Sequence, residues 1–107
     1  MKVDAEEIFS FLVALTEASG KTLRELRVPA LELLEISPKL NRLNENECNR
    51  ELTQREVKQG ERLDKRVNEI AAELGVTATL GGDPRGASIQ LNYPGRHNGW
   101  GDGVIVP

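Results

Sequence analysis

Glycine is distributed so unevenly along this chain that the sequence divides into two parts. Seven of the ten glycines lie between Gly81 and Gly103, and three of the five prolines follow residue 75. The residues before position 76 are instead rich in Leu, Glu, Arg and Lys. Glycine and proline favour turns, whereas these four residue types favour helices. The sequence therefore predicts helices over 1–75 and short strands and turns over 76–107.

The length and the cysteine content indicate one intracellular domain. A chain of 107 residues has the size of a single domain and can bury a core without disulfides or metals. We therefore expect one α+β domain over 1–107. Cys48 is the only cysteine, which fits a reducing compartment, and we expect it to be a small buried residue on a helix. We see neither a signal-peptide pattern nor a long apolar run, so we expect a cytoplasmic protein.

Helix signals in the first part mark several segments. We expect a first helix over 4–18, capped by Asp4 and ended by Gly20, with one apolar stripe: Ile8, Phe11, Leu12 and Leu15. A second, short helix is predicted to start at Thr22, with Glu25 completing a capping box, and to be interrupted at Pro29 before it continues to about residue 35. The Ser37-Pro38 pair predicts another helix start.

The clearest predicted element is a long charged helix from about Glu45 to Leu74, closed by Gly75. Thirty helical residues would span about 45 Å, which is long for a domain of this size. We therefore expect that the helix either breaks near Gly60 or packs against a partner chain, and we favour a homodimer formed through it.

Three strands are predicted in the second part, over 76–80, 87–93 and 104–106. They alternate in hydrophobicity or are rich in β-branched residues, and Ile89 and Leu91 share one face of the second strand. We expect an antiparallel meander with a helix on one face.

Turn chemistry explains part of the glycine-rich stretch. Asp83-Pro84-Arg85-Gly86 has the residue preferences of a type I turn, and Tyr93-Pro94-Gly95-Arg96 those of a type II turn. The side chains that these turns leave unexplained are Arg85, Arg96, His97, Asn98 and Trp100. Together they suit an anionic, partly aromatic ligand such as a nucleotide. The alternatives are ordinary roles, with Trp100 in the core and the polar residues in surface loops. Adjacent hairpin turns also lie at opposite ends of a meander, which argues against a single pocket.

Other function classes have weaker support. Catalytic triads and metal-ligand spacings are not found, and Asp83, His97 and Asp102 are the only candidates for an acid/base or metal cluster. We therefore expect no enzyme, no cofactor and no metal. The net charge of −3 argues against direct nucleic-acid binding. A helix-turn-helix over 21–43 keeps a DNA-binding regulator as an alternative, although its LELLEI segment is acidic and apolar.

Residues 46–107 resemble a family of small phage and prophage proteins. The shared features are a Cys-Asn pair, Cys48-Asn49, that leads a charged helix, followed by GDPRG and GRHNGWG segments. The resemblance implies a phage or mobile-element origin, but no catalytic residue. It implies a non-enzymatic counter-defence factor, an inhibitor of a host immune effector such as CRISPR–Cas, that binds a host protein complex. The alternative is a sponge that binds a nucleotide-like anion through Arg85 and Arg96.

Overall fold

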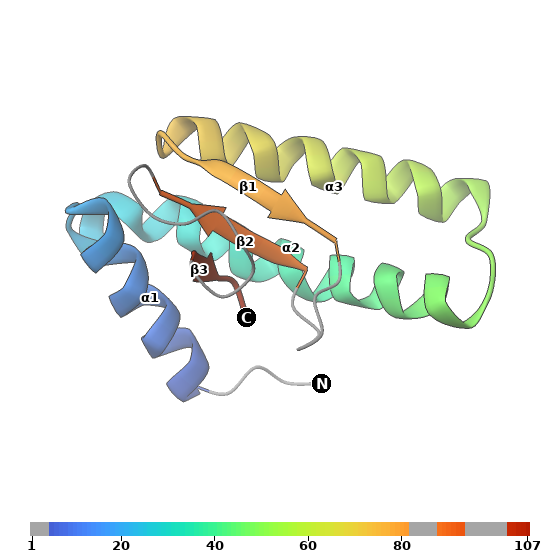
Figure 1. Cartoon of the computed structure of the whole chain (residues 1–107), viewed down its shortest axis with the longest axis horizontal. Helices are drawn as coiled ribbons and strands as arrows, with labels where there is room; N and C mark the ends of the chain where they lie inside the picture. The colour runs from blue at the N-terminus through green and yellow to red at the C-terminus, as the bar shows by residue number, and fades with distance from the viewer. Residues whose placement is uncertain (1–4, 82–87, 94–102) are drawn as a thin grey trace.

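The computed structural model describes residues 5–81, 88–93 and 103–107. These residues form, in chain order, α1 (Ala5–Ser19), α2 (Leu23–Asn49), α3 (Gln54–Glu73), β1 (Thr77–Leu80), β2 (Ile89–Asn92) and β3 (Val104–Ile105). Helices therefore come first and a small sheet last, as Figure 1 shows. The predicted α+β class is confirmed.

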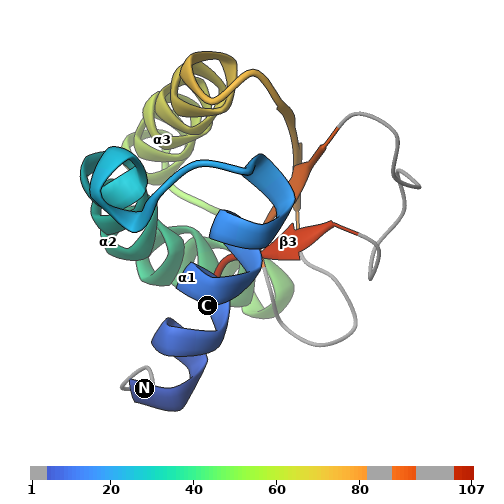
Figure 2. The same ribbon diagram turned by 90° about the vertical axis from the view of Figure 1, so that its left-hand side faces the viewer.

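The three strands form the predicted antiparallel meander. Strand β2 lies between β1 and β3, and Leu91 pairs with Ala78 on one side and with Val104 on the other. All three helices lie on the same side of the sheet (Figure 2). We expected one helix on this face of the sheet, but α1, α2 and α3 together cover it and form the second layer.

One hydrophobic cluster joins the helical and the β part of the chain. Residues of all three helices pack with the strand residues that face them. The fully buried members include Leu15, Leu26, Leu33, Val67, Ile70, Ile89 and Leu91. The predicted common face of Ile89 and Leu91 is confirmed, since both side chains are buried in this cluster.

Helix α2 is one continuous helix, and the predicted interruptions at Pro29 and at Ser37-Pro38 are wrong. Its buried side chains recur at spacings of four and three residues across both prolines: Leu26, Ala30, Leu33, Ser37 and Leu40. Each proline removes one hydrogen bond of the helix, but burial of this row favours continuation of the helix. The helix-turn-helix interpretation of 21–43 is wrong for the same reason, because no turn separates two helices there.

The predicted helix from Glu45 to Leu74 is also wrong. Its first residues form the end of α2, and α3 starts anew after Thr53. Arg50 leaves the helix in an extended conformation, and Thr53 caps α3 through a capping box with Glu56. The Thr53-Gln54-Arg55-Glu56 sequence is a standard helix start, and it was the signal for the break that we overlooked.

The length of α3 therefore does not call for a partner chain to cover it. Helix α3 has 20 residues and passes through Gly60 without a break, so it spans about 30 Å. The described structure is 41 Å long with a radius of gyration of 13.6 Å, and α3 packs along α2 (Figure 1). The helix is covered by its own domain, and a homodimer needs a different argument.

The predicted helix ends are largely confirmed. Helix α1 ends before Gly20, and Thr22 caps α2 through a capping box with Glu25. Gly75, at φ 75°, closes α3: its N–H donates to the carbonyl of Ala72, and the N–H of Val76 donates to that of Ala71. This is the Schellman arrangement. The predicted cap Asp4 lies outside the described residues.

Candidate functional site

The ligand-binding residues predicted from the sequence lie outside the part of the chain that the structure describes. These are Arg85, Arg96, His97, Asn98 and Trp100. The acid/base candidates Asp83, His97 and Asp102 lie outside it as well. Both interpretations remain predictions. The described residues that flank the two segments are Gly81, Ser88, Tyr93 and Gly103.

The two glycine-rich segments join the sheet at opposite ends of β2. One connects Gly81 to Ser88, beside the Leu80–Ile89 pair, and the other follows Tyr93, beside the Thr77–Asn92 pair. Four residues of strand separate these ends by roughly 13 Å. The sequence-based argument that the two turns start a strand length apart is therefore confirmed for their points of attachment.

Between these points, β2 carries a row of buried polar side chains on the face away from the helices. The Gln90 side chain is fully buried and that of Asn92 nearly so. Gln90 Nε2 donates to Asn92 Oδ1 at 2.7 Å, and Asn92 Nδ2 donates to Thr79 Oγ1 at 2.7 Å. A buried amide row is costly unless its polar groups have hydrogen-bond partners. We call Thr79, Gln90 and Asn92 the polar row.

Ser88 and Gly103, which lie beside the polar row, both have close neighbours. Asn44 Nδ2 donates to Ser88 Oγ at 2.8 Å, and Ser88 Oγ in turn donates to Asn41 Oδ1, so α2 holds the start of β2. At the other end, a Cβ atom on Gly103 would lie 2.4 Å from the Leu91 carbonyl oxygen and 2.8 Å from Gln90 Cγ. Only glycine fits there, which explains one member of the glycine-rich stretch by packing alone.

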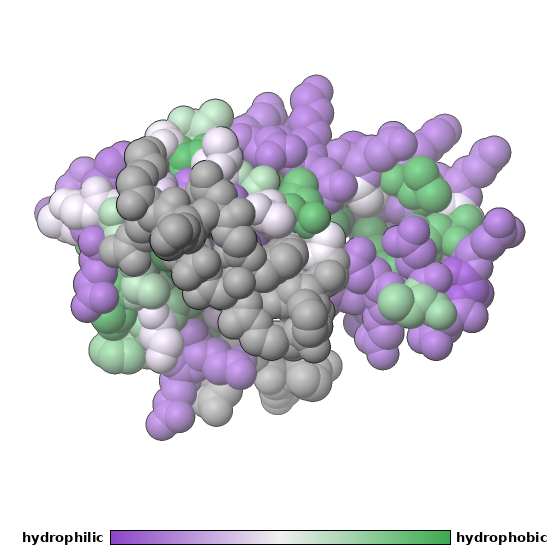
Figure 3. Space-filling view, viewed as in Figure 1, coloured by the Kyte–Doolittle hydropathy of each residue, from purple (hydrophilic) through white to green (hydrophobic). Residues whose placement is uncertain are grey.

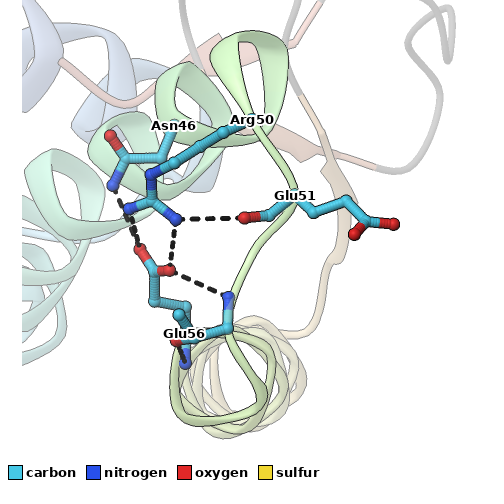
Figure 4. A network of polar contacts seen from close by, with 5 residues as sticks. Asn46, Arg50, Glu51 and Glu56 are labelled. Atoms are coloured by element: carbon cyan, nitrogen blue, oxygen red, sulfur yellow. Dashed lines mark hydrogen bonds and ion pairs between the residues drawn. The ribbon is translucent and has the colours of Figure 1, made fainter.

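The tightest polar cluster lies at the corner between α2 and α3 (Figure 4). The Glu56 carboxylate accepts hydrogen bonds from both terminal nitrogens of Arg50, at 2.7 and 2.9 Å. It also accepts from Asn46 Nδ2 at 3.2 Å and from the Thr53 N–H at 3.0 Å. The hydrogen bonds from Arg50, and after them those from Thr53, lower the pKa of Glu56 from 4.5 to about 2. All four bonds close the corner, so the cluster has a structural explanation.

The expectation of a buried Cys48 is wrong, because its side chain is exposed. It lies in the last turn of α2, after the end of the buried row, and so it does not lead a charged helix. An open hollow of about 630 Å³ beside it is lined in part by Leu52 and Val57. Small apolar patches stand among hydrophilic side chains at this end of the molecule in Figure 3.

Helix α1 exposes apolar side chains on the side opposite its buried stripe. Phe11 and Leu15 are buried, but Phe9 is 68% exposed and Val13 37%. Phe9 and Val13 are four residues apart and therefore neighbours on the helix surface. We call this outward side, with Glu6 and Glu17 one turn before and after, the α1 face. The sequence held a signal for it, since Phe9 and Val13 do not belong to the predicted apolar stripe.

The described groups offer little for acid/base or metal chemistry. The Tyr93 hydroxyl is buried without a hydrogen-bond partner among the described residues, and burial raises the pKa of Tyr93 above its ordinary value of 10.0, so the phenol stays protonated. Within residues 5–81, 88–93 and 103–107, no three His, Cys, Asp or Glu side chains gather to hold a metal ion.

Comparisons with known proteins add no family. Neither a protein-family model nor a curated protein nor a solved structure matches the chain. The resemblance to phage proteins therefore stays a prediction from the motifs. In the described part of the chain, none of the helices combines the length and the hydrophobicity needed to cross a membrane.

Proposed function

We propose that this chain is a non-enzymatic binding protein that acts by contacting another protein through its α1 face. The observation that carries the proposal is the 68% exposure of Phe9. Aromatic side chains contribute most to interfaces when they enter a pocket of the partner. Phe9 and Val13 form an apolar centre on α1 that can enter such a pocket.

The charges around this centre specify the partner's chemistry. Helix α1 carries Glu6, Glu7 and Glu17 and no lysine or arginine, and all three are exposed. A complementary surface has an apolar pocket with lysine or arginine at its rim. We therefore infer that the partner presents such a pocket.

The resemblance to phage proteins supplies the biological setting of this proposal. A phage protein of this type would bind a host protein complex and act against host defence, and effectors that hold nucleic acids carry basic surfaces. An acidic helix with an apolar centre suits such a surface. Helix α1 carries acidic residues without basic ones. The charged segment 42–69, in contrast, has as many basic as acidic residues, so the α1 face is the more acidic surface.

Affinity capture from a bacterial lysate, followed by mass spectrometry, tests the proposal. We expect the wild-type protein to retain a defined protein partner, and Phe9→Ser to lose it because the apolar centre is removed. Glu17→Lys should lose it as well, since it places a cation against the basic rim. Val57→Ser is the matched control, because Val57 is an exposed apolar side chain on α3, 43% accessible.

Two outcomes would contradict this proposal. If Phe9→Ser retains the same partner as the wild type, the α1 face is not the binding surface. If Val57→Ser loses the partner equally, the loss reflects general surface hydrophobicity. Circular dichroism of each variant establishes that the fold is retained.

A ligand sponge is the second candidate, and the polar row supports it. The polar row lies between the attachment points of the two segments that carry Arg85 and Arg96, and a few placed polar groups orient ligands in binding pockets. Thermal unfolding with a panel of mono-, di- and cyclic nucleotides tests this candidate. We expect a raised melting temperature with one of them, lost in Arg85→Ala or Arg96→Ala. Unchanged melting with every nucleotide would exclude it.

A further inference from the structure

A second exposed stripe runs along the first half of α2, on the side away from its buried row. Arg24, Val28, Leu31 and Glu35 follow one another at spacings of four, three and four residues. This spacing keeps all four side chains on one side of a helix. Val28 is 73% exposed and Leu31 55%, and both charged residues are exposed. We call these four residues the α2 stripe.

The charges of the α2 stripe have no partner in the described part of the molecule. Neighbouring charges are paired there: Arg66 forms a bidentate ion pair with Glu32, one bond of which is 2.7 Å long. That bond lowers the pKa of Glu32. Arg24 and Glu35, in contrast, form no ion pair among the described residues. The α2 stripe therefore has at its ends two opposite charges without an ion pair among the described residues, and between them two exposed apolar side chains.

This order is complementary to itself when read in the opposite direction. If two copies of α2 lie antiparallel, with a two-fold axis between positions 29 and 30, position 24 faces position 35 of the other copy. Position 28 then faces position 31. Arg24 meets Glu35 at both ends, and Val28 meets Leu31 twice in the centre. A two-fold interface requires this kind of self-complementary patch.

We propose that two copies of this chain associate through their α2 stripes, antiparallel and related by a two-fold axis. The contact spans three helical turns, about 16 Å, and is smaller than the interfaces of obligate dimers. A weak dimer that forms with rising concentration is expected. A dimer in which both α1 faces stay uncovered would bind a repeated partner more tightly than one copy does.

Sedimentation equilibrium of the full chain, over concentrations from micromolar to millimolar at low salt, measures this association directly. The wild type should change from monomer to dimer within that range. Val28→Ser with Leu31→Ser should raise the dissociation constant roughly tenfold, because the apolar centre is lost. Both side chains are exposed in the monomer, so the fold should persist, which circular dichroism checks.

Charge reversal identifies the partner as a second copy. Arg24→Glu places two carboxylates against each other at both ends of the interface, and Glu35→Arg does the same with two guanidinium groups, so each should weaken the dimer roughly tenfold. Combining both changes in one chain should restore it. Mixing the two single variants should also restore it, since each then meets its opposite. Lys58→Glu on α3 makes the same charge change outside the stripe and should have little effect.

Several results would overturn the inference. These are a wild type that stays monomeric throughout, a Lys58→Glu variant that weakens the dimer as much as Arg24→Glu does, or single variants whose mixture fails to associate. A monomeric protein that still captures its partner through Phe9 would refute the dimer alone and leave the proposed function standing.

Discussion

Glu56 shows how one side chain sets the direction of the chain. Its carboxylate accepts a hydrogen bond from the N–H of Thr53, the N-cap of α3, and pairs with Arg50, the C-cap residue of α2. Charge-assisted bidentate pairs have a narrow geometry, and here the geometry fixes the turn between two helices. The same donors that close the corner also lower the pKa of Glu56 to about 2.

The lowered pKa predicts how stability depends on pH. A carboxyl whose pKa is lower in the folded than in the unfolded state stabilises the fold above the unfolded value, here about 4.5. This contribution is lost as the pH falls through the folded value near 2. Glu56→Gln removes it, so the difference in free energy of unfolding between wild type and variant should be constant above the ordinary pKa and shrink below it. Urea unfolding across this range measures the difference.

A control separates this effect from the general response to acid. Glu61→Gln removes an exposed carboxylate of the same helix, outside the Arg50 cluster. The difference in free energy of unfolding between this variant and the wild type should be the same at every pH. A difference for Glu56→Gln that stays the same down to pH 2 would show that the corner does not depend on the ionised carboxylate.

Two glycines, one inside α3 and one just after its end, have opposite roles, and substitution by alanine tests both. Gly60 is in the interior of α3, and an added Cβ would lie 3.6 Å from Leu43 Cδ1, an ordinary contact. Gly60→Ala should therefore raise the free energy of unfolding by about 0.5–1 kcal/mol, because alanine favours helix. Gly75→Ala should lower it by about 1–2 kcal/mol, because φ is +75° there. Chemical denaturation of both variants measures the sign. Destabilisation by Gly60→Ala would mean that α3 packs closer to α2.

The helix boundaries show where local sequence signals are sufficient and where they are not. Capping at Thr22 and closure at Gly75 were predictable, because each depends on neighbouring residues alone. The prolines of α2 misled the prediction, because burial of Leu26, Leu33 and the rest of their row outweighs the local preference for a break. The corner at Arg50 was missed, since a charged segment without proline or glycine favours one continuous helix.

At the scale of the whole molecule, composition predicted the order of helices and sheet, and alternation predicted the meander. What it did not predict is which apolar side chains remain exposed. Phe9 and Phe11 have the same side chain, but helical spacing puts Phe11 in the predicted apolar stripe and leaves Phe9 outside it. The packing of α1 on the sheet and on α2 buries Phe11 and leaves Phe9 68% exposed. Helical spacing therefore separates the two side chains, whereas the extent to which Phe9 is exposed follows from the placement of the helices.

If the α1 face binds another protein, the affinity for that protein depends on Phe9. Titration calorimetry of the purified captured partner with wild type and Phe9→Ser tests it most directly. We expect the variant to bind at least about thirtyfold more weakly, since an aromatic side chain at the centre of an interface contributes about 2 kcal/mol or more. Equal affinities of the two proteins would contradict it.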